Sequence, residues 1–143
     1  MKRIMFGITT IICLGILTGC SNKKLECTTT GTDIGKKVIT NTEVSFKSGK
    51  VSRVKRKIEM NFEEIYTESL EAIFVPLKEE YDKLNEQEGM KVNLVKGDNT
   101  ITIDLDMDVK KYAKNGNEDD VVDISLSRDD MKKSLESDGY TCK

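Results

Sequence analysis

Two consecutive stretches of this chain alternate apolar and polar side chains, and this restricts what the chain can fold into. In residues 38–46 and again in residues 54–62, the even positions are mostly apolar or β-branched and the odd positions are mostly polar. Because side chains along a strand point to alternate faces, a period of two predicts two strands that each bury one face. Arg56 is the exception on the even face. We therefore expect a half-buried antiparallel hairpin here.

The turn KSGK at residues 47–50 determines how these two strands pair. A two-residue loop, Ser48-Gly49, would pair Glu43 with Val54 and would mix the buried and exposed faces. A three-residue loop of residues 47–49 keeps the faces consistent and places Gly49 in the left-handed position. We therefore expect Thr42 opposite Val54.

Residues 61–88 carry apolar side chains at helical spacing and predict a long amphipathic helix. Asn61 and Glu64 match a capping box at its start, and Gly89 is a suitable stop. Pro76 lies inside this segment and lacks a backbone N–H. We expect a kink or a helix restart there.

The second half of the chain predicts a further hairpin and a C-terminal helix. Residues 90–95 and 100–107 alternate again, and a loop of even length between them places Lys91 opposite Asp104. Residues 109–113 are expected to form one helical turn, and Ser127 with Asp130 caps the last helix. With residues 25–31 as a first strand, the predicted fold class is α+β: an antiparallel sheet of two hairpins plus an N-terminal strand, with a long helix and a C-terminal helix packed on one face.

The N-terminus has the pattern of a secretory signal peptide. Basic residues at positions 2 and 3 precede an apolar run from Ile4 to Leu17, which is shorter than the ~20 residues that a membrane-spanning helix needs. The run ends in Leu17-Thr18-Gly19-Cys20, which resembles the lipobox of bacterial lipoproteins. This resemblance implies cleavage before Cys20, a diacylglyceryl group on its thiol and acylation, for example by palmitate, of the new amine.

This reading divides the chain into a signal peptide at residues 1–19, a lipidated tether at residues 20–24 and a single α+β domain at residues 25–143. The lipid on Cys20 implies a membrane partner on the extracytoplasmic side of the cell membrane. Two acyl chains anchor a protein stably where one does not. Ser21 would permit sorting to an outer membrane in a cell that has one. A plain secreted protein and a retained membrane span are the alternatives.

Two further cysteines, Cys27 and Cys142, lie near the ends of the mature chain. Disulfides persist outside the cytoplasm, so we expect these two residues to form one. Two free thiols and a reactive pair are the alternatives. For a bridge, the C-terminal segment must run along the first strand.

Two acidic clusters are candidates for metal chemistry, and both are also typical of a solvated surface. The sequence contains no His, which excludes Ser–His and Cys–His catalysis. We expect no enzyme activity, no cofactor and no bound metal. The alternative is a small metal-dependent module or enzyme that uses carboxylates, which suit calcium. Those carboxylates belong to Asp104, Asp106 and Asp108, or to Glu118, Asp119 and Asp120.

A basic segment in the first hairpin is the candidate interaction surface. Such a patch near a bilayer would bind anionic headgroups, a wall polymer or an envelope protein. The alternative is a solvated sheet face neutralised by Glu43 and Glu59. With a formal net charge of −2, the chain lacks the basic excess of a nucleic-acid-binding protein. The residues of the candidate patch are Lys47, Lys50, Arg53, Lys55 and Lys57.

The lipobox, the hairpin–helix–hairpin order and the mature length together resemble the small bacterial lipoproteins grouped as YehR-like, whose function is uncharacterised. The resemblance carries no catalytic motif and implies no activity. We therefore expect a membrane-anchored lipoprotein with a non-enzymatic binding or envelope-accessory role and an unknown ligand.

Overall fold

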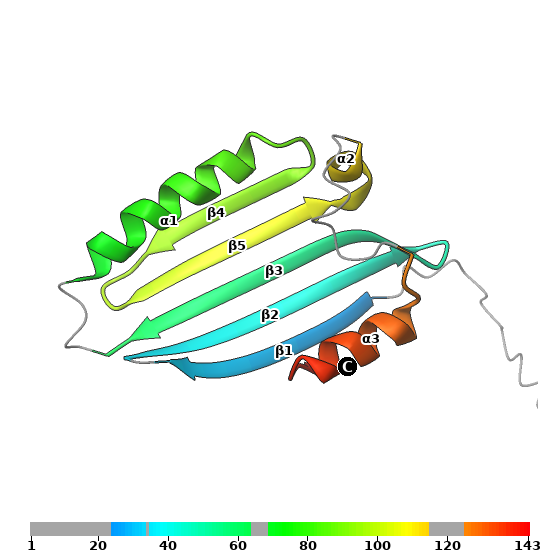
Figure 1. Cartoon of the computed structure of the whole chain (residues 1–143), viewed down its shortest axis with the longest axis horizontal. Helices are drawn as coiled ribbons and strands as arrows, with labels where there is room; N and C mark the ends of the chain where they lie inside the picture. Colours follow the sequence, from blue (N-terminus) through cyan, green and yellow to red (C-terminus); the bar gives the residue numbers. More distant parts are fainter. Residues whose placement is uncertain (1–23, 34, 64–68, 115–124) are drawn as a thin grey trace, which may run out of the picture.

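The computed structural model describes residues 24–33, 35–63, 69–114 and 125–143. These residues form six strands in one antiparallel sheet of order β4-β5-β3-β2-β1-β6, together with three helices (Figure 1). The α+β prediction is therefore confirmed. The strands are β1 (Lys24–Asp33), β2 (Lys36–Lys47), β3 (Lys50–Phe62), β4 (Met90–Lys96), β5 (Thr100–Asp108) and β6 (Thr141–Cys142). The helices are α1 (Leu70–Asn85), α2 (Val109–Ala113) and α3 (Arg128–Ser137).

All three helices pack on one face of the sheet, which we call the helix face. One hydrophobic cluster joins α2 and α3 to β1, β2 and the end of β5, and it includes Leu25, Val44 and Met131. A second cluster joins α1 to the other end of β3, β4 and β5 around Ile101 and Ile103. In Figure 1, α1 follows the β4 edge and α3 follows the β1 edge. The opposite face, which we call the open face, carries none of the described helices.

The first hairpin differs from the predicted register, because a β-bulge separates its turn from its strands. Lys47 pairs with Lys50 across a two-residue turn, in which Ser48 and Gly49 both have positive φ. Beyond the turn, the register shifts so that Val44, and not Thr42, lies opposite Val54. The three-residue loop was therefore the wrong prediction.

The bulge is the physical reason for this difference. Ser45 pairs with Arg53 and Phe46 pairs with Val51, which leaves Ser52 as the extra residue. The Ser52 hydroxyl donates to the Ser45 carbonyl at 3.0 Å. One extra residue restores the alternation, so Val51 and Val54 are both buried.

The second hairpin keeps the predicted faces but is shifted by two residues. Lys91 lies opposite Asp106, and Asn93 takes the place opposite Asp104. A shift of two residues preserves the side-chain alternation, so the pattern alone could not distinguish the two registers.

The long helix is shorter than predicted at both ends. Residue Asn61 belongs to β3, so the predicted capping box of Asn61 and Glu64 does not start a helix; Glu64 itself lies outside the described residues. Helix α1 begins at Leu70 and continues through Pro76 to Asn85 without a restart. Phe62 explains the error, because its apolar side chain fits the end of a strand and the start of a helix equally well.

Helix α3 has the predicted ends. The Ser127 side chain accepts a hydrogen bond from the Asp130 backbone N–H at its start. At its end Gly139 has a positive φ, and the N–H groups of Gly139 and Tyr140 donate to the carbonyls of Glu136 and Leu135. The one-turn helix predicted at residues 109–113 is present as α2.

The predicted signal peptide and lipidation site lie within residues 1–23, which are not among the described residues. Within the described part of the chain, no helix has the length and apolar character that crossing a bilayer requires.

Candidate functional site

The open face presents rows of charged and amide side chains that cross the sheet from edge to edge. The register places Lys55 between Glu43 on β2 and Asp106 on β5. One step along the strands, Lys57 lies between Asn41 and Asp104. Because alternate residues point to opposite faces, these two rows stand side by side on the face that the helices leave uncovered.

A groove of about 580 Å³ lies at these two rows and spans five strands. Its floor is the intervening row, whose side chains, such as Thr42 and Leu105, belong to the helix face. The groove is mixed in charge and rich in hydrogen-bonding groups. The residues whose side chains belong to the open face here are Glu26, Thr28, Asn41, Glu43, Lys55, Lys57, Lys91, Asn93, Asp104 and Asp106.

Arg53 and Asp106 form a bidentate ion pair beside the groove. The guanidinium Nε and Nη2 atoms donate to the two carboxylate oxygens at 2.6 and 2.5 Å. This bidentate geometry lowers the pKa of Asp106, first through the hydrogen bond from Arg53 and then through the charges of Arg53, Lys55 and Lys91. The same contact raises the pKa of Arg53. Asp106 is therefore a carboxylate at every physiological pH.

Most of the remaining charged side chains of the groove are available to a ligand. The exception is Glu43, which pairs with Lys24 at 3.1 Å. The ammonium groups of Lys55, Lys57 and Lys91 form no ion pair with a described residue. The groove therefore offers unpaired cations among carboxylates and amides, which suits a polar ligand that carries both signs of charge.

The structure divides the basic patch that the sequence indicated. Arg53, Lys55 and Lys57 lie on the open face, where the aspartates of β5 stand beside them. Lys47 and Lys50 instead flank the two-residue turn at the end of the hairpin. Sequence reasoning missed the acidic neighbours because β3 and β5 are joined by a long connection that includes α1.

Two of the three aspartates of β5 have partners within the protein. Asp106 is held by Arg53, and the Asp108 side chain caps α2 by accepting a hydrogen bond from the Lys111 N–H at 3.2 Å. No group of three or more His, Cys, Asp or Glu side chains within the described ranges is arranged to hold a metal. The second acidic cluster, Glu118, Asp119 and Asp120, lies outside the described residues, as does Cys20.

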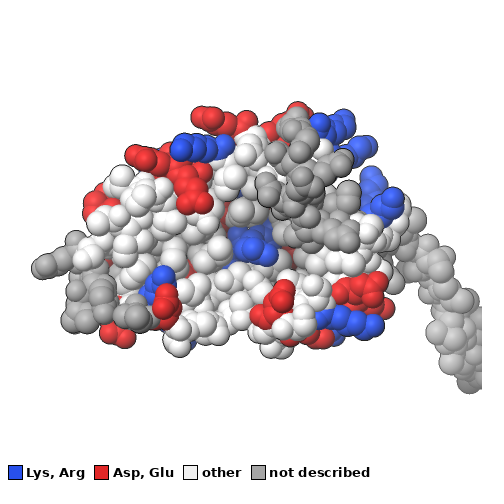
Figure 2. Space-filling view, in the orientation of Figure 1, with Lys and Arg blue, Asp and Glu red and all other residues white. Residues whose placement is uncertain are grey.

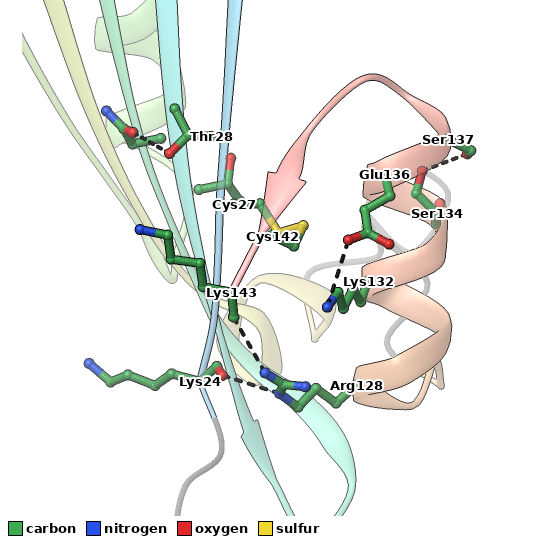
Figure 3. Close-up of a disulfide and its surroundings, with 12 residues drawn as sticks. Lys24, Cys27, Thr28, Arg128, Lys132, Ser134, Glu136, Ser137, Cys142 and Lys143 are labelled. Atoms are coloured by element: carbon green, nitrogen blue, oxygen red, sulfur yellow. Dashed lines mark hydrogen bonds and ion pairs between the residues drawn. A yellow bond between two sulfur atoms is a disulfide. The ribbon is translucent and has the colours of Figure 1, made fainter.

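Cys27 and Cys142 are bonded to each other where β6 pairs with β1 (Figure 3). Their Cα atoms are 4.1 Å apart, and Cys27 is buried. The Arg128 side chain donates to the backbone carbonyls of Lys24 and Lys143, so α3 also holds the start of β1 and the C-terminal residue (Figure 3). The C-terminal segment therefore runs along the first strand, as the predicted bridge required.

A second groove, of about 470 Å³, lies on the helix face between α1 and β3. Its walls include Met60, Phe62, Ile73 and Leu77. Figure 2 shows this face as largely uncharged, with charged residues around its rim and one basic patch near its centre over β3. Arg56 is the basic residue of β3 on this side, and its Nε donates to the Thr42 hydroxyl at 3.3 Å.

An amide side chain forms hydrogen bonds with the backbone of the outer edge strand, a contact that no sequence pattern indicated. Asn85 at the end of α1 accepts a hydrogen bond from the Val92 N–H and donates to the Val92 carbonyl, at 2.5 and 2.7 Å. The amide thereby imitates a neighbouring strand at the β4 edge, which protects the edge from pairing with another chain.

No protein-family model matches this sequence, and no curated protein sequence matches it significantly. Two solved structures share its fold. The NMR structure of the Escherichia coli YehR protein superposes with a TM-score of 0.55 at 14% identity, over 85% of this chain and 92% of that one. An NMR structure of a protein from Streptococcus pneumoniae TIGR4 superposes with a TM-score of 0.53 at 10% identity, over 100% of this chain and 98% of that one. The chain therefore shares the fold of the E. coli YehR protein.

Proposed function

We propose that this chain is a lipid-anchored lipoprotein of the extracytoplasmic membrane surface that binds a polar, mixed-charge ligand without catalysing a reaction. The observation that carries the binding role is the groove on the open face. It is large enough for a small ligand or a segment of a polymer, since ligand sites commonly occupy ~300–1,000 Å³. The lipobox at Cys20 supports the anchor.

The electrostatics of the groove favour binding over catalysis. The Asp106 carboxylate, which accepts hydrogen bonds from Arg53, has a lowered pKa and stays ionised. A carboxyl group that acts as a general acid needs a raised pKa instead. Bound by Arg53, this carboxylate acts as a fixed acceptor. Lys55, Lys57 and Lys91 then supply donors whose side chains a ligand can order.

Site-specific photo-crosslinking in intact cells tests this binding surface. A photoreactive amino acid at Asn41 or Asn93, both in the groove, should capture a discrete ligand or envelope component. The matched control is Lys133, an exposed position on α3. We expect crosslinks from the groove positions and none of the same product from the control.

A second variant separates specific binding from proximity. Lys57→Ala should lower the crosslinking yield from Asn41 several-fold, because it removes an unpaired ammonium from the groove, whereas Lys133→Ala should not change the yield. Equal yields from the groove and from α3, or no effect of Lys57→Ala in a folded protein, would contradict the proposal.

A further inference from the structure

The strands place one end of the molecule beside the tether. The residue Lys24 begins β1, four residues after Cys20. An extended chain spans at most ~3.6 Å per residue, so Lys24 lies within about 14 Å of the lipid-bearing residue. Strand β2 pairs its Ser45 with Lys24 and then continues beyond the start of β1 to the turn at Ser48 and Gly49. This turn therefore lies at the tether end of the molecule.

Helix α2 lies at the same end of the sheet. It begins directly after Asp108, the last residue of β5. Asp108 pairs with Arg53 on β3, and Arg53 in turn pairs with Ser45 on β2. In Figure 1 the start of β1, the β2–β3 turn and α2 lie at one end of the molecule, and α1 begins at the other. Figure 2 shows basic side chains at this end over α2 and beside the turn. The lysines that flank the turn, together with those of α2 and its C-cap, are Lys47, Lys50, Lys110, Lys111 and Lys114, which we call the tether-end lysines.

The tether-end lysines are exposed, and their ammonium groups form no ion pair with a described residue. Most of the described carboxylates nearby are already engaged, whereas Glu86 and Glu88, in the turn that packs on α2, form no ion pair with these lysines. Glu43 pairs with Lys24, Asp106 pairs with Arg53, and Asp108 caps α2. Asp129 at the start of α3 lies 3.8 Å from Arg128. The five tether-end lysines thus outnumber the two unpaired carboxylates beside α2, which leaves an excess of basic charge at this end among the described residues.

We propose that the tether-end lysines dock the domain on the anionic headgroups of the bilayer that holds its lipid. The tether lets the start of β1 approach the headgroups closely. When this end of the molecule faces the bilayer, the tether-end lysines lie within a Debye length of ~10 Å of the surface, where their attraction to anionic headgroups is only partly screened. Docking at this end would orient the strands away from the membrane and leave the open-face groove accessible. This inference rests on the proposed anchor at Cys20.

Amine labelling of the protein on vesicles tests the docking. The chain as the cell processes it is mixed with vesicles of phosphatidylcholine alone, or with vesicles that also contain phosphatidylglycerol, and labelled lysines are mapped by mass spectrometry. With phosphatidylglycerol present, labelling of the tether-end lysines should fall several-fold and should recover at high salt. Lys36 and Lys37, at the opposite end of the sheet, should be labelled equally on both vesicles.

Charge reversal supplies the matched variants. Each lysine near an anionic surface contributes about fivefold in partitioning, so Lys47→Glu with Lys50→Glu should lower the preference for phosphatidylglycerol vesicles by at least about tenfold. Lys36→Glu with Lys37→Glu changes the net charge equally and should leave the preference within about twofold, because these residues lie far from the tether.

The outcomes separate the docking from the anchor. A protein that floats with both vesicles, but shows the same labelling on each, has the anchor and lacks the docking. A protein that does not float with phosphatidylcholine alone lacks the anchor; in that case, salt-sensitive flotation with phosphatidylglycerol and protection of the tether-end lysines supports docking. No flotation with either vesicle overturns it.

Discussion

Gly89 lies where the backbone of the α1–β4 turn closely approaches the backbone at the start of α2. Its φ is +90°, and its carbonyl accepts a hydrogen bond from the Asp108 N–H at 2.8 Å. A Cβ atom there would lie 2.7 Å from the Tyr112 nitrogen and 2.8 Å from the Asp108 oxygen. The glycine therefore permits the close approach of the α1–β4 turn to the start of α2.

Alanine substitution at two glycines separates clash from backbone strain. Gly139 also has a positive φ, +86°, but nothing lies within 4 Å of its Cβ position. Gly139→Ala should lower the free energy of unfolding by about 1 kcal/mol through strain alone. Gly89→Ala should lower it by about 3 kcal/mol, because backbone atoms must also shift. Urea denaturation measures both, and equal losses would show that the turn relaxes away from α2.

A second prediction at this scale concerns Asp106, whose folded-state pKa is lowered by Arg53. A lowered pKa stabilises the fold fully above the unfolded value of ~3.9, and this stabilisation is lost as the pH falls through the folded value. The Asp106 side chain is 28% exposed and that of Arg53 is 51% exposed, so screening limits the contribution to about 1 kcal/mol or less.

Asp106→Asn should therefore destabilise the protein slightly at neutral pH, and its difference from the parent should shrink below about pH 4. Asp104→Asn is the matched control, because Asp104 lies on the same face of β5 and its carboxylate has no ion-pair partner among the described residues. Urea denaturation across the acid range measures this, together with NMR titration of the Asp106 carboxyl. A carboxyl that titrates normally in the parent would show that the bidentate contact does not persist in solution.

At the scale of elements, α3 is attached by few contacts. Its buried residue is Met131, and Leu135 packs beside it against the first cluster. Arg128 adds hydrogen bonds to the carbonyls of Lys24 and Lys143, and the disulfide holds β6 against β1. The bond between Cys27 and Cys142 closes a loop with a sequence separation of 115 residues. Closing such a loop is expected to raise the free energy of unfolding by ~4 kcal/mol in the chain-entropy treatment.

Reduction of the disulfide should therefore loosen α3 and β6 before the central hairpin. Hydrogen exchange should speed up at the amides of α3 under reducing conditions, while those of β2 and β3 stay protected, because they are paired on both sides. Cys27→Ser with Cys142→Ser should reproduce this pattern and make the protein insensitive to reductant. Two free thiols in the native protein, found by non-reducing mass mapping, would contradict the bridge.

At the scale of the whole molecule, the first and last described strands lie side by side at one edge of the sheet. Strand β6 pairs with β1, and the Lys143 N–H donates to the Glu26 carbonyl at 2.8 Å. Cys27 lies seven residues after Cys20, so the disulfide and the proposed lipid are close in the chain. An anchor at Cys20 would thus hold the molecule at the edge that its own covalent bond reinforces.

The anchor has a direct test. Cys20→Ala should abolish lipid labelling and leave the protein either uncleaved or released, because the acylated thiol is the proposed anchor. Cys13→Ala changes a cysteine within the apolar run and should leave labelling intact. Palmitate labelling and detergent phase partitioning measure the outcome. A Cys20→Ala protein that partitions like the parent would rule out the lipobox.

The sequence alone determined those features that depend on local patterns. The alternation in residues 38–46 and 54–62 defined the faces of β2 and β3, and Ser127 and Gly139 marked the ends of α3. These signals work because side-chain direction and capping depend on neighbours only a few residues away. The pairing of Cys27 with Cys142 was predicted by counting, since the proposed location outside the cytoplasm favours disulfides and the proposed lipidation and cleavage leave these two cysteines as the pair.

Tertiary structure decided the features that depend on pairing between distant segments. The spacing of three between Val51 and Val54 was compatible with several turns, and the bulge at Ser52 chose among them. The antiparallel pairing of β3 with β5 placed Asp104 and Asp106 beside Lys55 and Lys57. No local pattern contains that pairing, because a register shift of two residues keeps every side chain on its face. The groove and its charges therefore follow from strand order and register, which are properties of the assembled sheet.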